Sequence, residues 1–201
     1  MRRDSFLCCS VYGIGVFSAL VLFLISCNPY KEGERYLKEG KYAEAVKFYE
    51  EKVKAKPDNS VLRNQLGFSY AKLGKYMEAR REYDKAIELN KNYAEAYYNL
   101  GTLLMSRPFL LLNDAVKQFD KAIELNPNYA KAYNNRGMTY TYLGDFEKAK
   151  KDLETALKLS PDNKVFKDNL EYCSRMEDVN RVLLENREKK EAESQKQSKP
   201  K

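Results

Sequence analysis

The chain contains no histidine and no tryptophan, and only 9 glycines and 6 prolines among its 201 residues. Histidine is the commonest general acid or base near neutral pH and a frequent zinc ligand. Its absence removes the usual serine–histidine and cysteine–histidine nucleophile pairs. No carboxylate pair, glycine-rich phosphate loop or metal-ligand cluster takes its place in the sequence. We therefore expect a protein that is not an enzyme and that uses no cofactor and no metal ion.

Cysteine and net charge are limited as well. Of the four cysteines, Cys8 and Cys9 lie within the first 26 residues, Cys27 follows them, and Cys173 stands alone in the rest of the chain. If the first 26 residues are removed and Cys27 is acylated, no disulfide can form within the chain. Cys173 is then interpreted as a buried or half-buried helix residue, with a redox role as the alternative. The formal net charge of +7 is spread along the sequence, and nucleic-acid binding needs a dense basic stripe, so no nucleic-acid partner is expected.

A long hydrophobic run occurs once, near the start of the chain. Arg2 and Arg3 precede an almost wholly apolar stretch from residue 11 to residue 26, VYGIGVFSALVLFLIS. A helix of that length spans about 24 Å, which is short for a bilayer core of roughly 30 Å but typical of a signal peptide. The run ends in Leu-Ile-Ser-Cys at Cys27, which resembles the lipobox of bacterial lipoproteins.

The lipobox resemblance implies cleavage before Cys27 and acylation of its thiol, with palmitate among the expected acyl groups. The folded part would then lie outside the cytoplasm in the bacterial cell envelope, tethered to the outer or inner membrane. An uncleaved membrane anchor and a plain secretory signal are the alternatives.

Five columns of residues recur at intervals of 34 to 36 residues after this leader. Their members are Gly33, Gly67, Gly101 and Gly137; Ala45, Ala79, Ala115 and Ala149; Tyr49, Tyr83, Phe119 and Leu153; Lys52, Ala86, Ala122 and Ala156; and Pro57, Lys91, Pro127 and Pro161. The pattern resembles the tetratricopeptide repeat. It implies an all-α solenoid of about four helix-turn-helix units, at residues 27–59, 60–93, 94–129 and 130–163.

The periodicity within a unit agrees with two helices. Leu62, Leu66 and Tyr70 lie at i, i+4 and i+8 and predict one apolar face of a first helix. Gly74 can adopt the positive φ that ends such a helix. Gly67 and Ala79 are expected to face each other, because small residues let two helices approach closely.

The two ends of the array and the third unit depart from this pattern. The first helix of the first unit should be shortened by its closeness to Cys27, and residues 164–184 should form a capping helix, followed by a charged, disordered tail at 185–201. The third unit has two extra residues, and Pro108 should end its first helix at about Ser106. The run 109–112 either folds back on the solenoid or is an exposed contact for a partner or the membrane.

The resemblance also implies a binding surface, because the first helices of such repeats line a concave groove. The residues carried over to it are Asn64, Phe68, Lys72, Tyr98, Thr102, Asn134, Met138 and Tyr142. Amides and phenols can bond a peptide backbone, whereas the ring of basic residues with which co-chaperones of the family hold a terminal carboxylate is missing. We therefore expect an envelope lipoprotein that acts as a scaffold or adaptor for a protein or peptide partner. The alternative is a structural lipoprotein that binds cell-wall polymer through its basic tail.

Overall fold

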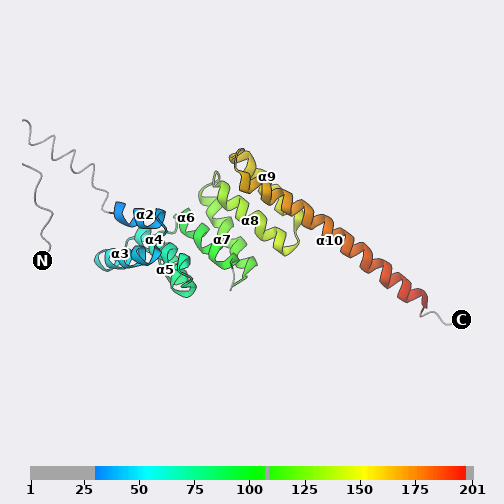
Figure 1. Cartoon of the computed structure of the whole chain (residues 1–201), viewed down its shortest axis with the longest axis horizontal. Helices are drawn as coiled ribbons and strands as arrows, with labels where there is room; N and C mark the ends of the chain where they lie inside the picture. Colours follow the sequence, from blue (N-terminus) through cyan, green and yellow to red (C-terminus); the bar gives the residue numbers. More distant parts are fainter. Residues whose placement is uncertain (1–29, 107–108, 198–201) are drawn as a thin grey trace, which may run out of the picture.

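The computed structural model describes residues 30–106 and 109–197, with the backbone alone from residue 192 onward. These described residues form helices and turns without any strand (Figure 1). In chain order the helices are α2 (Lys31–Lys38), α3 (Tyr42–Ala55), α4 (Ser60–Lys72), α5 (Tyr76–Leu89), α6 (Ala94–Met105), α7 (Leu112–Leu125), α8 (Ala130–Leu143), α9 (Phe146–Leu159) and α10 (Lys164–Gln197). The predicted all-α class is confirmed, whereas Cys27 and the hydrophobic run before it lie outside the described residues.

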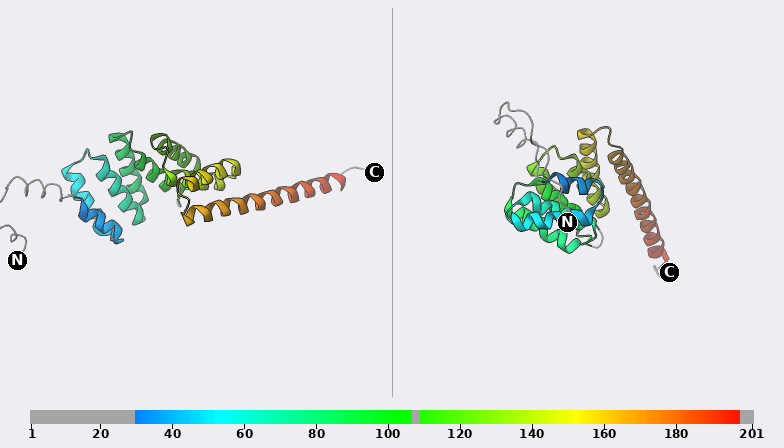
Figure 2. Two further views of the ribbon diagram at one scale, coloured as in Figure 1. Left: turned by 90° about the horizontal axis from the view of Figure 1, so that it is seen from above. Right: turned by 60° about the vertical axis from the view of Figure 1, so that its left-hand side comes forward.

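The helices stack as consecutive hairpins (Figure 2). The most extensive helix pairs are α4 with α5, α6 with α7, and α8 with α9. The short α2 makes a smaller contact with α3, and each hairpin packs on the next. In each hairpin we call the earlier helix the first helix and the later one the second helix. First helices of neighbouring units also touch, since α4 contacts α6 and α6 contacts α8. The helix α10 contacts both α8 and α9 and so takes the place of a first helix in a further unit.

Close packing within a hairpin depends on the glycine column. A Cβ atom added at Gly67 would lie 2.8 Å from the ring of Tyr83 and 3.1 Å from the carbonyl oxygen of Ala79, so only a hydrogen atom fits there. The predicted approach of Gly67 to Ala79 is therefore confirmed. The alanines of the second helices, such as Ala86 and Ala122, are fully buried between units.

The turn between the two helices needs a left-handed residue. Gly40, Gly74 and Gly144 have φ values of 72°, 75° and 79°, which confirms the role predicted for Gly74. The third unit has no glycine at this place, and Leu110 adopts a φ of 47° instead. A branched side chain in this conformation is unusual, because its Cβ crowds the neighbouring backbone.

The extra residues of the third unit divide into two groups. Helix α6 ends at Met105, beside the predicted end, while Pro108 itself lies outside the described residues. Phe109 folds back into the core between units two and three, with its ring 6.5 Å from that of Tyr76. Leu110 and Leu111 remain 54% and 40% exposed. Phe109 therefore folds back on the solenoid, as the first interpretation expects, whereas a contact of Leu110 and Leu111 with a partner or the membrane stays a prediction.

Helix α10 differs from the prediction at its far end. It continues unbroken to Gln197, where a disordered tail was expected from residue 185, and projects well beyond the stack (Figures 1 and 2). The segment is rich in Glu, Lys, Gln and Arg, which are strong helix formers. Arg187 and Glu191 add an ion pair of 3.1 Å one turn apart. Among the described helices, none combines the length and apolar character needed to cross a bilayer.

Candidate peptide-binding surface

The first helices lie side by side along one face of the solenoid, which we call the inner face. It is built from α4, α6, α8 and the start of α10. Two matching amide pairs connect these helices: Asn99 donates from Nδ2 to Oδ1 of Asn64 at 3.0 Å, and Asn169 donates from Nδ2 to Oδ1 of Asn134 at 2.8 Å. Each pair joins the first helices of neighbouring units, so the row of amides ties the face together.

The accepting members of these pairs lie below the surface. Asn64 is fully buried and Asn134 is 6% exposed, because the first helix of the next unit covers each of them. The amide of Asn64 also donates to Oη of Tyr93 at 3.3 Å and to a carboxylate oxygen of Glu95 at 3.4 Å. Asn64 and Asn134, which were predicted to contact a partner, therefore form their hydrogen bonds within the solenoid. Their physical effect is to orient the half-buried donors of the next helix.

The middle of the inner face is aromatic. The ring of Tyr98 lies 4.9 Å from that of Tyr129 and 6.1 Å from that of Phe119. Asn135 donates from Nδ2 to the hydroxyl oxygens of Tyr98 and Thr102, at 3.4 and 3.1 Å. Burial raises the pKa of Tyr98 and Tyr129 above the usual value for tyrosine. Both phenols are therefore neutral near pH 7, and the hydroxyl oxygen of Tyr98 accepts a hydrogen bond.

The end of the inner face formed by the N-termini of the first helices includes one exposed carboxylate, on α6. Tyr93 precedes α6 and its hydroxyl lies 3.5 Å from a carboxylate oxygen of Glu95, which is exposed. Burial, with the nearby Glu95 carboxylate, raises the pKa of Tyr93 to about 12. A ligand meeting this end would therefore face one carboxylate and neutral polar groups.

The other predicted contact residues are more scattered. Phe68 is half-buried on α4, and the ammonium of Lys72 lies 5.2 Å from its ring centre. Met138 packs on the cluster around Leu153 and Cys173, whereas Tyr142 is 53% exposed. The structure thus brings Tyr98, Thr102 and Asn134 together through Asn135, and no bond joins Phe68, Lys72, Met138 or Tyr142 to that group.

Five residues of the inner face were not predicted from the sequence. They are Tyr93, Asn99, Tyr129, Asn135 and Asn169. The amides carry a signal that could have found them, because Asn64, Asn99, Asn134 and Asn169 are spaced 35 residues apart. The positions carried over from the repeat family identified only the buried members of the pairs, Asn64 and Asn134. They missed the half-buried members, Asn99 and Asn169.

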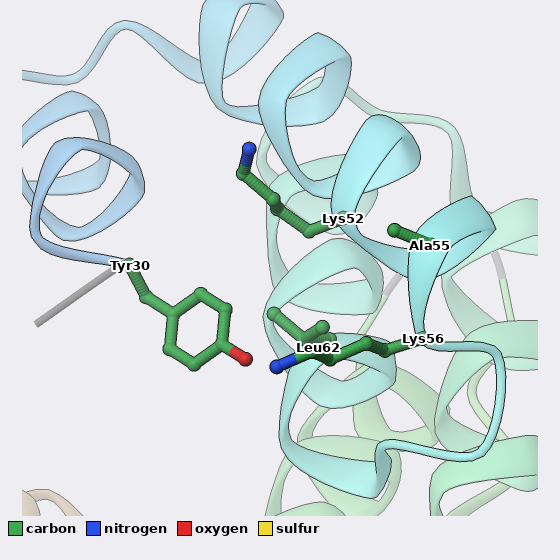
Figure 3. Close-up of a pocket in the computed structure, with 5 residues that line it drawn as sticks. All are labelled: Tyr30, Lys52, Ala55, Lys56 and Leu62. Carbon is green, nitrogen blue, oxygen red and sulfur yellow. The ribbon is translucent and has the colours of Figure 1, made fainter.

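A separate pocket of about 140 Å³ lies at the N-terminal end of the solenoid (Figure 3). Tyr30, Lys52, Ala55, Lys56 and Leu62 line it. In the part of the chain that the structure describes, no group of three acidic or cysteine side chains could hold a metal ion.

Comparison with known proteins identifies the repeats. Family models described as tetratricopeptide repeat match residues 30–59 and 130–163, and a model described as TPR repeat matches 67–106 and 112–141. Serine/threonine-protein phosphatase 5 of Rattus norvegicus is 36% identical over 141 residues, which cover 70% of this chain. The chain spans only 21% of that phosphatase, so the match concerns a part of the relative.

Solved structures show the same architecture. YrrB, described as a TPR protein with an unusual peptide-binding site, is 32% identical with a TM-score of 0.59, over 69% of this chain and 71% of its own. MamA is 27% identical with a TM-score of 0.62, over 80% and 96% of the two chains. The first TPR of Spaghetti (RPAP3), bound to an HSP90 peptide, is 29% identical with a TM-score of 0.55, over 58% and 91%. The chain therefore belongs to the tetratricopeptide-repeat family.

Proposed function

We propose that this chain is an adaptor that holds an extended peptide segment of a protein partner against its inner face and catalyses no reaction. The observation that carries the proposal is the row of half-buried amides on the first helices, with Asn99 on α6 and Asn169 on α10, on either side of α8. Asn99 and Asn169 each give one N–H to a buried neighbour, and their amide oxygens accept no hydrogen bond from the described residues. An amide side chain has two donors and one acceptor oxygen, so each retains capacity for a peptide N–H and C=O.

The chemistry of the inner face sets the kind of peptide. Backbone bonding by amides is tolerant of sequence, while the half-buried rings of Tyr98 and Phe68 offer apolar contact. Peptide binding by YrrB and by the first TPR of RPAP3 supports the same use here. The exposed carboxylate of Glu95 disfavours an acidic segment at that end of the face.

Site-specific photo-crosslinking in the native envelope tests which face meets the partner. A photoreactive phenylalanine analogue at Tyr142 or Phe68 should crosslink one protein in common. The same analogue at Met77, which is 60% exposed on the second helix α5, should not capture that protein. Capture from Met77 alone would place the partner on another face and refute this function.

A variant pair then tests the amides themselves. Replacing Asn99 and Asn169 by Ala should weaken binding of the crosslinked partner roughly thirtyfold, since each lost hydrogen bond contributes about 1 kcal/mol. Asn113→Ala is the matched control, because this exposed amide lies on the second helix α7. Circular dichroism should show unchanged helical content in both proteins. Equal partner affinity for the double variant and the control would exclude the amide row.

We also propose that the adaptor is a lipoprotein of the bacterial cell envelope, cut before Cys27 and held to a membrane by acyl chains. The basic start, the apolar run and the Leu-Ile-Ser-Cys sequence support it. Two or three acyl chains, at about 0.8 kcal/mol for each buried methylene, form an anchor that does not readily leave the bilayer. Cys27→Ser should abolish lipid labelling and leave an uncut precursor. An intact mass that includes residues 1–26 without acyl groups would exclude the lipoprotein.

A further inference from the structure

The pocket at the N-terminal end arises from two departures of the first unit. Helix α2 has 8 residues, whereas the first helices α4, α6 and α8 have 12 to 14. At the buried alanine column the first unit carries Lys52, where the other units have Ala86, Ala122 and Ala156. The lysine fits because no full-length first helix packs over it. Its side chain is 32% exposed.

A second lysine departs from the repeat on the same side. Lys56 stands where the other units have Asn90, Asn126 and Ser160. Figure 3 shows both side chains extending from the end of α3, with the Lys56 ammonium pointing toward the hydroxyl of Tyr30 and the Lys52 ammonium turned away from it. In the first unit, therefore, Lys52 stands at a position that is alanine in the other units, and Lys56 stands at one that is neutral and polar. Both lysines line the same pocket.

The charges of these lysines are only weakly compensated. Lys52 forms an ion pair of 3.2 Å with Glu51, whose side chain is 76% exposed, and water screens such a pair strongly. Its ammonium also lies 5.0 Å from the ring centre of Phe48. The exposed Lys56 forms no ion pair with the described residues. The wall of the pocket includes Leu62 and Ala55, which are apolar. A lining that combines two lysines with an apolar wall suits an anion attached to a hydrocarbon group.

The place of the pocket in the chain identifies the anion. Two residues, Asn28 and Pro29, stand between Cys27 and Tyr30, so the chain between them spans at most about 11 Å. Tyr30 itself lines the pocket. With acyl chains on Cys27, the pocket would lie near the membrane surface, at a separation comparable with the Debye length of about 8 Å at physiological salt. Phospholipid headgroups are then the most abundant anions within its reach.

We propose that this pocket binds the phosphate of an anionic phospholipid headgroup in the membrane that holds the chain, an inference that rests on the proposed acyl anchor at Cys27. The ammonium groups of Lys52 and Lys56 contact the phosphate, and Leu62 and Ala55 contact the glycerol carbons. Headgroup binding fixes the first unit on the bilayer and leaves the inner face of the later units open to the partner.

Amide hydrogen exchange of the lipidated wild-type chain tests this contact. Vesicles of phosphatidylcholine alone are compared with vesicles that contain roughly one third phosphatidylglycerol. Exchange in α2 and at the end of α3 should slow by up to about thirtyfold on the anionic vesicles, because each lysine near such a surface contributes about fivefold. The protection should disappear in about 1 M salt, where the Debye length is about 3 Å.

Two double variants locate the site. Lys52→Gln with Lys56→Gln should lose the lipid-dependent protection. Lys158→Gln with Lys167→Gln, two exposed lysines at the other end of the solenoid, should keep it. Exchange in α6 and α8 reports that both variants remain folded. Protection retained in the first variant would place any headgroup contact elsewhere and overturn the proposal.

The wild type alone separates failure of the anchor from failure of the headgroup site. A chain that washes off both kinds of vesicle refutes the anchor and the headgroup contact together. A chain that stays on both, with equal exchange in α2, refutes the headgroup contact and leaves the anchor standing.

Discussion

The relative stability of two variants at Leu110, one with glycine and one with alanine, tests whether the backbone is strained there. At most helix or turn positions alanine is more stable than glycine, because glycine loses more conformational freedom on folding. Leu110 has a φ of 47°, in the region where a side chain costs about 1–2 kcal/mol. We therefore predict that Leu110→Gly is more stable than Leu110→Ala, by about 1 kcal/mol. Both variants lose the same side chain apart from one methyl group, so the comparison isolates the backbone.

The magnitude can be read from urea denaturation followed by circular dichroism. For an m-value of about 2 kcal/mol/M, a difference of about 1 kcal/mol moves the midpoint by roughly 0.5 M. Met77 supplies the control, since it is 60% exposed on α5 and lies in ordinary helical conformation. There the order should reverse, with alanine more stable than glycine by about 1 kcal/mol.

Equal midpoints for the two Leu110 variants, or a higher midpoint for alanine, would refute strain at this turn. A parallel result is expected at Gly74, where alanine should lower the midpoint because φ is 75°. Agreement between the two sites would show that Leu110 occupies the glycine position of its unit despite the two extra residues.

Three further predictions concern packing and charge. Ala122→Leu should lower the free energy of unfolding by about 1–3 kcal/mol in chemical denaturation, because Ala122 is fully buried between helices. Tyr49→Phe should raise the free energy of unfolding by about 1 kcal/mol, since the buried hydroxyl has no hydrogen-bond partner among the described residues. Burial raises the pKa of Tyr49 to about 12, so the alkaline loss of stability that starts near pH 10 should also become shallower in the variant. Arg136→Met should lower the free energy of unfolding by about 3 kcal/mol, because it leaves the buried carboxylate of Asp152 without the two hydrogen bonds of 2.6 and 2.8 Å that Arg136 donates. The double variant Arg136→Met with Asp152→Leu should recover most of that loss, because no unpaired charge remains buried.

The repeat architecture was predictable from the sequence because its determinants are local. The glycine column and the turn glycines each act within one hairpin, as at Gly67 and Gly74, and the spacing of these columns gives the unit length. The strained turn at Leu110 was not predicted, because two extra residues hide its alignment with Gly74. The length of α10 was underestimated, because a lack of apolar periodicity was interpreted as disorder although the residues favour helix.

The inner face was harder to predict because accessibility there depends on the neighbouring unit. Asn64 and Asn134 occupy positions that the family exposes, yet α6 and α10 cover them here. The sequence of one helix does not show which residues are buried, because each of these asparagines is covered by the next first helix and bonded to a residue 35 positions later.

The same dependence on neighbours explains why the first unit can differ. Lys52 stands in a column whose other members, Ala122 among them, are fully buried by the helices on either side. Removing one neighbour, by shortening α2, relieves the constraint and turns a packing position into a surface position. The freed position carries a cation and opens a pocket next to the predicted acylation site. In a solenoid, therefore, terminal units are where side chains can change from packing to binding without disturbing the stack, because each unit contacts only its neighbours.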